Sequence, residues 1–257
     1  MAPPILKLDN IFLSFGGSPL LNGAGFQLEP GDRLCLVGRN GSGKSTVLKT
    51  LFGLLKPRQG DILLDGVSVA GATQKQLLAQ GIAFVPQGRN LFGQLSVFEN
   101  LRCAVLWSLG YKYTFFKFLA HLDDANARAH ALMQMIKLDK KHDVLAMNLT
   151  YAEQRALEIG ITIGGGANVI LLDEPTAGMS RSETTRFIHL IKEVTEGRTL
   201  LTVEHDMGVV FGLADKIAVV VYGEVIAFDT PDKVRANVRV QEAYLGSAVA
   251  DAQAGGH

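Results

Sequence analysis

The chain has 257 residues, of which 47% are hydrophobic and 19% charged, and this composition excludes an intrinsically disordered protein. Lysine and arginine number 25, as do aspartate and glutamate, so the net charge is zero and no overall positive field attracts nucleic acid. The cysteines Cys35 and Cys103 are too few for a disulfide framework and favour a reducing compartment. The N-terminus has no secretory signal pattern and no stretch of ~18 apolar residues occurs, so we expect a soluble chain.

Short apolar segments alternate with amphipathic helical segments, which predicts an α/β fold with a largely parallel sheet. Such runs also fit buried helices, but flanking Gly and Asp and the β-branched content favour strands. The expected buried strands are 33–37, 82–85, 169–172, 200–203 and 217–221.

Three capping boxes predict helix starts, because a hydroxyl and a carboxylate three residues later satisfy each other's backbone N–H groups. The pairs are Ser96 with Glu99, Thr150 with Glu153, and Ser180 with Glu183.

Between positions 87 and 150 the strand pattern disappears, and the segments 97–107 and 124–138 are expected to be helical. We therefore predict an all-helical subdomain, at about 88–163, inserted in the core. The aromatic stretch 111–119 within it is either a surface for another protein or the membrane interface, or part of the subdomain core. The tail, 247–257, is predicted to be flexible.

A glycine-rich segment directly after the strand 33–37 matches the P-loop pattern, with a helical segment (47–52) behind it. Its glycines let successive N–H groups and the helix N-terminus face phosphates, while Lys44 reaches the β and γ oxygens and Ser45 supplies a Mg²⁺ ligand. The nucleotide-binding candidates are Gly38, Asn40, Gly41, Ser42, Gly43, Lys44, Ser45 and Thr46.

The apolar strand 169–172 is followed by two carboxylates, Asp173 and Glu174. Alone, two solvated acids at a strand end would be the commoner interpretation. Together with a P-loop they predict a Walker B motif, in which Asp173 binds Mg²⁺ and Glu174 polarises a water molecule.

These motifs, in this order, resemble the ATP-binding subunit of ABC transporters over nearly the whole chain. The resemblance implies one ABC ATPase domain at 1–246, with a P-loop NTPase core, a mostly parallel sheet and an antiparallel β portion at the N-terminal side. It also implies that Phe15 stacks on adenine, that Gln87 is the Q-loop glutamine and a Mg²⁺ ligand, and that His205 is the switch histidine. Taken alone, Phe15 would be a core aromatic and His205 a capping or core histidine. The D-loop that it implies is 176–180, with Gly178 and Ser180.

The signature motif departs from the family's usual Leu-Ser-Gly-Gly-Gln, because here it consists of Thr150, Tyr151, Ala152 and Glu153 after a leucine. In the family this helix start contacts the γ-phosphate of the ATP held by the opposite subunit. Ala152 places a methyl where glycine allows close approach. Glu153 either points a carboxylate at the phosphate site or turns back to cap its own helix, and we favour the cap.

Tyr151, the following Arg155 and the segment 157–159 look like the subfamily that imports branched-chain amino acids, urea importers included, as does the ending 240–246. The resemblance implies an ATPase that couples ATP and Mg²⁺ to import of amino acids or a related small polar or organic-acid solute. Its expected partners are permease subunits, a second ATPase of the same or a related chain, and indirectly an external solute-binding protein, with no nucleic acid. It would work peripherally on the cytoplasmic face of the inner membrane.

Two other functions remain open from the sequence. One is a nucleotide-gated soluble interaction protein without a transporter, although the chain has one cassette, no heptad run and no basic face. The other is a P-loop kinase that phosphorylates a small molecule, for which the signature segment and His205 would be coincidences.

Overall fold

The computed structural model describes residues 3–17, 19–88, 90–111 and 122–243. The predicted flexible tail, and all of the aromatic stretch except Tyr111, lie outside these residues. The chain divides into two compact units. The first unit joins the residues up to Gln74 with those from Thr199 onward, and the second unit is Lys75–Arg198.

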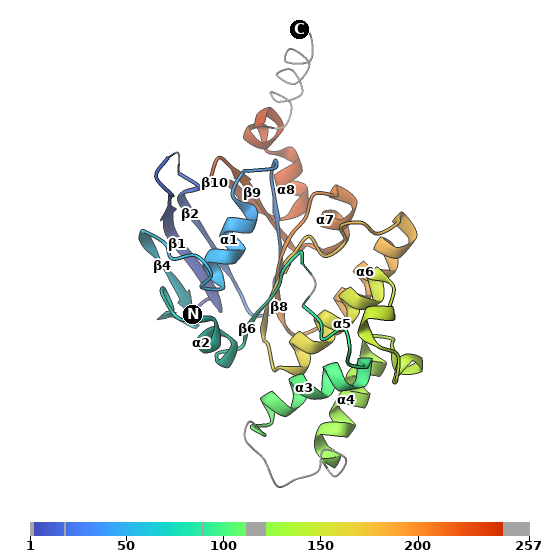
Figure 1. Cartoon of the computed structure of the whole chain (residues 1–257). Coiled ribbons are helices and arrows are strands. Elements are labelled where there is room, and N and C mark those ends of the chain that lie inside the picture. The colour runs from blue at the N-terminus through green and yellow to red at the C-terminus, as the bar shows by residue number, and fades with distance from the viewer. Residues whose placement is uncertain (1–2, 18, 89, 112–121, 244–257) are drawn as a thin grey trace. The chain divides into compact units, whose positions relative to one another are not determined.

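An antiparallel sheet opens the first unit and confirms the β portion expected at the N-terminal side (Figure 1). In it β1 (Leu6–Leu13) pairs with β2 (Leu21–Leu28) on one side and β4 (Gln59–Leu64) on the other, and β5 (Val67–Ser68) follows β4. The leucines of β1 and β2 alternate with more exposed residues, so one face of this sheet is apolar.

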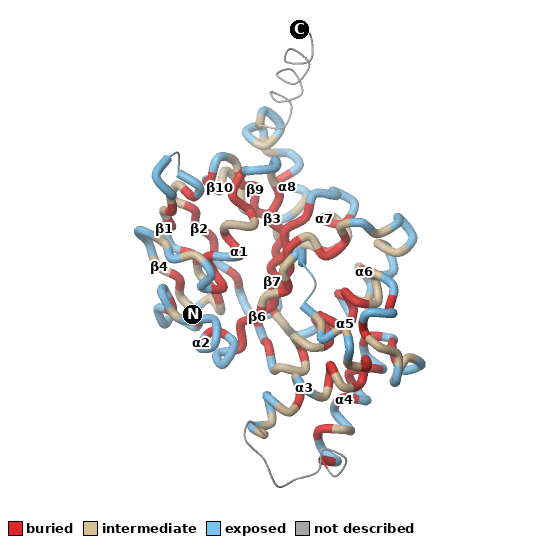
Figure 2. Tube along the Cα trace, in the orientation of Figure 1, coloured by how far each residue is buried: buried red, intermediate tan, exposed pale blue. Residues whose placement is uncertain are grey.

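The second sheet of this unit is mainly parallel. Strand β3 (Arg33–Val37) lies between β8 (Thr199–Val203) and β9 (Lys216–Val221), parallel to both, and β10 (Glu224–Asp229) is antiparallel to β9. Figure 2 shows β3 and β9 as buried, as expected of strands covered on both faces. The rings of Phe26 on β2 and Phe228 on β10 stack 6.3 Å apart and join the two sheets. Helices α1 (Lys44–Leu51), α7 (Met207–Leu213) and α8 (Pro231–Ala236) complete the unit.

The second unit is built around the parallel pair β6 (Ile82–Val85) and β7 (Val169–Asp173), whose register joins Ile82 to Val169. Helix α2 (Gln74–Ala79) precedes this pair. Between the two strands lie α3 (Val97–Ser108), α4 (Asp123–Met135), the 3₁₀ turns η2 (Asp139–Lys141) and η3 (Ala146–Asn148), and α5 (Tyr151–Gly164); α6 (Arg181–Val194) follows β7. The described residues between β6 and β7 contain no strand beyond one isolated bridge, although the bounds of a helical subdomain stay a prediction.

All five predicted strands occur within one residue of their expected bounds, and all three capping boxes form at the starts of α3, α5 and α6. The prediction of a helix over 124–138 was wrong at its end: α4 stops at Met135, because Lys137 has φ 60°, which an α-helix does not accommodate. The helix after the P-loop begins at Lys44 rather than at Val47.

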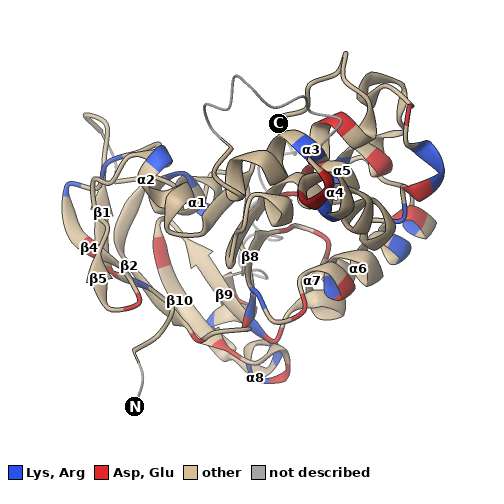
Figure 3. Cartoon of the chain, turned by 90° about the horizontal axis from the view of Figure 1, so that it is seen from below, with Lys and Arg blue, Asp and Glu red and all other residues tan. Residues whose placement is uncertain are grey.

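Charged residues are distributed over the loops and helices of both units, and in Figure 3 basic and acidic residues are interspersed along the ribbon of α6 and α8. Within the described ranges, no helix has the length and the apolar character that crossing a bilayer requires.

Candidate functional site

The P-loop leaves β3 and turns directly into α1, as its sequence predicts. Gly41 and Gly43 have φ values of 79° and 103°, which glycine adopts without strain, and Gly43 caps a helix that starts at Lys44. Ser42 Oγ is buried and has no hydrogen-bond partner among the described residues. An unpartnered hydroxyl in a glycine-rich turn at a helix N-terminus fits a loop that receives a phosphate.

Backbone from two other segments of the first unit packs closely against the loop. A Cβ atom on Gly38 would lie 2.2 Å from the Val220 carbonyl oxygen, and one on Gly43 would lie 2.7 Å from that of Leu20. Gly223, in the turn between β9 and β10, donates its N–H to Ser42 O at 2.9 Å. These contacts fix the path of the P-loop backbone and leave no space for larger residues at Gly38 and Gly43.

Lys44 is buried and its ammonium group is held inside the loop. It donates to the carbonyl oxygens of Gly38 and Arg39 at 2.8 and 2.9 Å. Ser45 and Thr46 follow it in the first turn of α1 and are half-buried, and Asn40 is exposed in the loop. The lysine is therefore placed at the loop that the sequence assigned to phosphate.

Phe15 and His205 also belong to the first unit. Phe15 is 67% exposed, which excludes the core aromatic that was its alternative interpretation. His205 is exposed two residues after the end of β8, so a core histidine is excluded as well, and its backbone N–H donates to Glu204 Oε2 at 3.3 Å. The structure thus places an aromatic ring and an imidazole on the surface of the first unit.

In the second unit β7 ends in the two predicted carboxylates. Asp173 is buried and Glu174 is half-buried, with a φ of 48° that is uncommon for a residue with a side chain. Glu174 Oε2 accepts a hydrogen bond at 2.9 Å from Nε2 of Gln87, which follows β6. The parallel pairing of β6 and β7 thus places both of these sequence-predicted residues at one sheet edge.

The signature segment begins α5, with Thr150 as its N-cap. Thr150 Oγ1 accepts from the Glu153 N–H at 3.4 Å, and Glu153 Oε2 accepts from the Thr150 N–H at 3.0 Å. The structure therefore supports the capping interpretation of Glu153. Tyr151 and Ala152 are half-buried in the first turn of this helix.

The same carboxylate has a partner that the sequence did not predict. Lys141 Nζ, in η2, lies 2.6 Å from Glu153 Oε1. Burial opposes ionisation, but the hydrogen bonds from Lys141 and Thr150 outweigh it and hold the pKa of Glu153 below its ordinary value. Glu153 is thus a fixed carboxylate at the start of the signature helix.

The predicted D-loop lies between β7 and α6. Gly178 is exposed with φ 80°, and Ser180 is the N-cap of α6, where its Oγ donates to Glu183 Oε2 at 2.6 Å. Ser180, which the sequence assigns to the D-loop, therefore also caps the N-terminus of α6.

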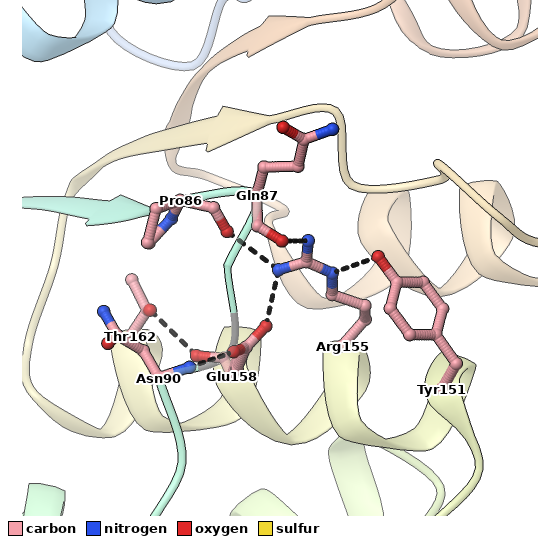
Figure 4. A network of polar contacts seen from close by, with 7 residues as sticks. All are labelled: Pro86, Gln87, Asn90, Tyr151, Arg155, Glu158 and Thr162. Atoms are coloured by element: carbon pink, nitrogen blue, oxygen red, sulfur yellow. Dashed lines mark hydrogen bonds and ion pairs between the residues drawn. The ribbon is translucent and has the colours of Figure 1, made fainter.

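A buried ion pair on α5 is the main feature of this unit that the sequence analysis missed. Arg155 Nη1 lies 2.8 Å from Glu158 Oε2 and donates to Pro86 O at the same distance (Figure 4). Arg155 Nη2 donates to the Gln87 carbonyl oxygen, while the Gln87 side chain points away, and Glu158 Oε1 accepts from Asn90 N–H at 2.7 Å. Burial acts to lower the pKa of Arg155, but the hydrogen bonds to Glu158 and Tyr151 outweigh it and raise the pKa above its ordinary value. This side chain therefore stays charged.

This network links the signature helix to the segment that carries Gln87. The only sequence signal for it was a pair of opposite charges three positions apart in an apolar helix, a spacing that occurs on solvated faces as well.

An apolar cavity of about 760 Å³ lies next to this network in the second unit. Its walls include Leu91, Phe92, Trp107 and Ile161, together with Asn90 and Glu158 from the polar network. Phe92 and Trp107 are 64% and 45% exposed. A cavity with exposed aromatic side chains at its walls is typical of a surface that binds another protein.

Each unit carries oxygen donors of the kind that suit a magnesium ion, Ser45 in the first unit and Asp173 and Gln87 in the second. Ser45 presents a hydroxyl, Asp173 a carboxylate and Gln87 an amide oxygen, and Mg²⁺ prefers such hard ligands. Among the residues that the structure describes, no three His, Cys, Asp or Glu side chains gather to hold a metal without further ligands.

Comparison with known proteins identifies the family. The family model "ABC transporter" matches residues 21–177, and the model "Branched-chain amino acid ATP-binding cassette transporter" matches residues 224–250. The high-affinity branched-chain amino acid transport ATP-binding protein LivG of Escherichia coli K12 is 35% identical over 255 residues, which cover 96% of this chain and 100% of LivG. The xylose import ATP-binding protein XylG of Photobacterium profundum is also 35% identical, but over 86% of this chain and 43% of XylG.

A solved structure agrees in fold over almost the whole chain. The crystal structure of the ADP conformation of an ATP-binding cassette of an ABC transporter has a TM-score of 0.81 at 25% identity, covering 95% of this chain and 99% of the other. With the P-loop, the two strand-end carboxylates and the full-length match to LivG, the α/β fold of a P-loop NTPase is confirmed. The chain belongs to the ATP-binding subunits of ABC transporters, the ATPases that are coupled to transport.

Proposed function

We propose that this chain powers an importer of branched-chain amino acids or of a related small polar or organic-acid solute. A branched-chain amino acid transport relative matches 96% of this chain over its own full length, and a family model named for the same transport matches residues 224–250. The xylose importer relative matches through less than half of its own length, so it supports a sugar importer less well than LivG supports an amino-acid importer.

Binding of ATP is assigned to the first unit. In the proposal Phe15 stacks on adenine, and the P-loop backbone N–H groups and Lys44 bind the phosphates. The present bonds of Lys44 to Gly38 O and Arg39 O place its charge within the loop, from which it would turn to the β and γ oxygens. Asn40, Ser42 and Thr46 complete the loop.

Hydrolysis is assigned to Glu174, and the observation that carries this assignment is its conformation. Its left-handed backbone and its bond to Gln87 hold a carboxylate at the end of a buried strand, where it can orient or deprotonate a water molecule. His205 would donate a hydrogen bond to the γ-phosphate. The proposal requires Lys44 and Glu174 to act on the same nucleotide.

Magnesium would be held by Ser45, Asp173 and Gln87 together with the nucleotide. When bound, it supplies charge that stabilises the phosphoryl group during transfer. Lys44, His205 and the loop amides act on the same charge from the protein side, so most of the rate enhancement comes from positioning and electrostatics.

A second cassette is part of the proposal, either another copy of this chain or a related one, and the family resemblance favours the related chain. Two cassettes would sandwich two ATP molecules, so that the segment Thr150–Glu153 of each faces the γ-phosphate bound by the other. The D-loop, with Gly178 and Ser180, would lie at the same interface. The self-capped start of α5 gives this helix a defined N-terminus at which to receive an anion.

The apolar cavity of the second unit is proposed as the docking site for a permease subunit. It borders the segment after Gln87, and Arg155 ties that segment to the signature helix. A permease bound there would contact the same network that positions the ATPase residues. The chain would then work on the cytoplasmic face of the inner membrane, peripherally, and meet a solute-binding protein only through the permease.

The test is Mg²⁺-dependent ATP hydrolysis by the wild type and Glu174→Gln, with nucleotide binding measured in parallel. We expect Glu174→Gln to lose at least about 100-fold in turnover while it keeps ATP binding, because removal of a general base has effects of this order. Glu196→Gln, an exposed glutamate outside the site, is the matched control. Undiminished turnover in Glu174→Gln would contradict the assignment.

A further inference from the structure

The start of the signature helix carries a negative charge that is restrained from two directions. Glu153 Oε2 accepts from the Thr150 N–H at 3.0 Å, and Glu153 Oε1 lies 2.6 Å from Lys141 Nζ. The Lys141 and Glu153 side chains are 38% and 26% exposed, so the pair is partly shielded from solvent. Each carboxylate oxygen therefore has a separate donor.

This arrangement matters because the N-terminus of α5 is also the place that the proposed function assigns to a phosphate. The positive end of the α5 dipole favours a carboxylate or a phosphate, and two anions that approach the same N–H groups repel each other. A carboxylate that swings freely at position 153 would compete with an incoming phosphate. A carboxylate whose two oxygens are already bonded to the Thr150 N–H and to Lys141 would compete less.

We propose that Lys141 is a positioning residue that keeps the Glu153 carboxylate turned toward Thr150, so that the signature helix can receive the phosphate of an ATP bound by the opposite cassette. This inference rests on the proposed function, since it needs the two-cassette sandwich. It assigns Lys141 no contact with the nucleotide.

The segment that carries Lys141 is attached to α5 firmly enough to serve this purpose. Lys141 N donates to Leu138 O at 2.9 Å, which closes the η2 turn. Further along, Gln154 Nε2 donates to the Ala146 carbonyl oxygen at 2.9 Å, so the residues between η2 and the signature are bonded to the helix. The Lys141 ammonium is thus presented from backbone that is fixed relative to Glu153.

The experiment measures ATP-dependent association of cassettes by sedimentation, in a Glu174→Gln background that retains ATP. The chain is assayed alone and with the second cassette of its transporter. The variants are Lys141→Met, Glu153→Gln and the double substitution, and Lys140→Met is the control that removes the neighbouring exposed charge. Salt at about 0.3 M suppresses long-range attraction between lysines and phosphates. Binding of a fluorescent ATP analogue to the P-loop is measured for each variant.

We expect Lys141→Met to weaken ATP-dependent association by about fivefold, which is the upper range for a partly exposed ion pair. Binding of ATP to the P-loop of the unassociated chain should not change. With Glu153→Gln present, the same substitution should change association less than about twofold, because no carboxylate remains to be held. Lys140→Met should behave as the wild type.

Two results would overturn the inference alone: association unaffected by Lys141→Met, or an equal loss with and without Glu153→Gln, which would mean that Lys141 acts on the phosphate itself. If no mixture shows ATP-dependent association, including the one in which the chain carries Glu174→Gln alone, the proposed sandwich is overturned, and this inference with it.

Discussion

Arg155 and Glu158 form an ion pair at 2.8 Å on α5 in which both side chains are 3% exposed. Both charged groups make further hydrogen bonds. Arg155 also donates to the carbonyl oxygens of Pro86 and Gln87, and Glu158 also accepts from the Asn90 N–H. A buried pair of this kind contributes little over an apolar pair, but it is sensitive to the loss of one member. Its value to the protein is the fixed path of the segment after β6.

The first prediction concerns this pair. Arg155→Met should lower the free energy of unfolding by about 3 to 5 kcal/mol, because it leaves the Glu158 carboxylate buried without its counterion. Chemical denaturation measures the change, and Arg186→Met, an exposed arginine on α6, should have an effect within about 0.5 kcal/mol. A loss below about 1 kcal/mol for Arg155→Met would show that the network relaxes around the unpaired acid.

The second prediction concerns the P-loop backbone. Gly38→Ala should weaken ATP binding by about tenfold or more, because its methyl group would meet the Val220 carbonyl oxygen at 2.2 Å and the loop must shift. Titration with a fluorescent ATP analogue measures this affinity. Gly88→Ala, at a glycine with open space around its Cβ position, is the control and should bind ATP as the wild type does. Equal affinities for both variants would contradict a loop held by its neighbours.

The third prediction concerns the signature position Ala152. If the methyl limits the approach of a phosphate, Ala152→Gly should raise ATP-dependent association by about threefold, and Ala152→Val should lower it. Sedimentation in the Glu174→Gln background measures both, and the steepness of ATPase rate against protein concentration gives a second readout. Equal association of the two variants, or the opposite order, would contradict a steric limit at this position.

The fourth prediction is a pH dependence at the start of α3. Hydrogen bonds from the Ser96 N–H and hydroxyl hold the pKa of Glu99 below its ordinary value of 4.5. A carboxyl with a lowered pKa in the folded state contributes stability above its ordinary pKa, and this contribution is lost as the pH falls through the folded value. Glu99→Gln should therefore be less stable than the wild type at neutral pH, and the difference should shrink toward zero as the pH falls through the lowered pKa of Glu99. Thermal unfolding across this range measures it, and a difference independent of pH would argue against a role for the charge.

The fold was predictable where a local pattern had one physical solution. The apolar run of β7 is bounded by polar residues and is too short for a buried helix, and the hydroxyl and acid at Ser180 and Glu183 have few other uses than a capping box. The end of α4 was not predictable in this way, because Lys137 is a good helix former and only its left-handed backbone terminates the helix.

The candidate site was predictable to the same extent. Gly38–Thr46 and Asp173–Glu174 are contiguous motifs, so their chemistry can be deduced without tertiary information. The Lys141–Glu153 pair joins residues twelve positions apart across an irregular segment, and no periodicity connects them. The left-handed conformation of Glu174 depends likewise on what surrounds the end of β7.

The contacts between the P-loop and the backbone at Leu20, Val220 and Gly223 bear on the thermodynamics of nucleotide capture. A loop whose path is already determined by its neighbours loses little conformational entropy when a phosphate arrives. The free energy of the phosphate contacts is then not spent on ordering the loop, and it remains available for the proposed closure of two cassettes.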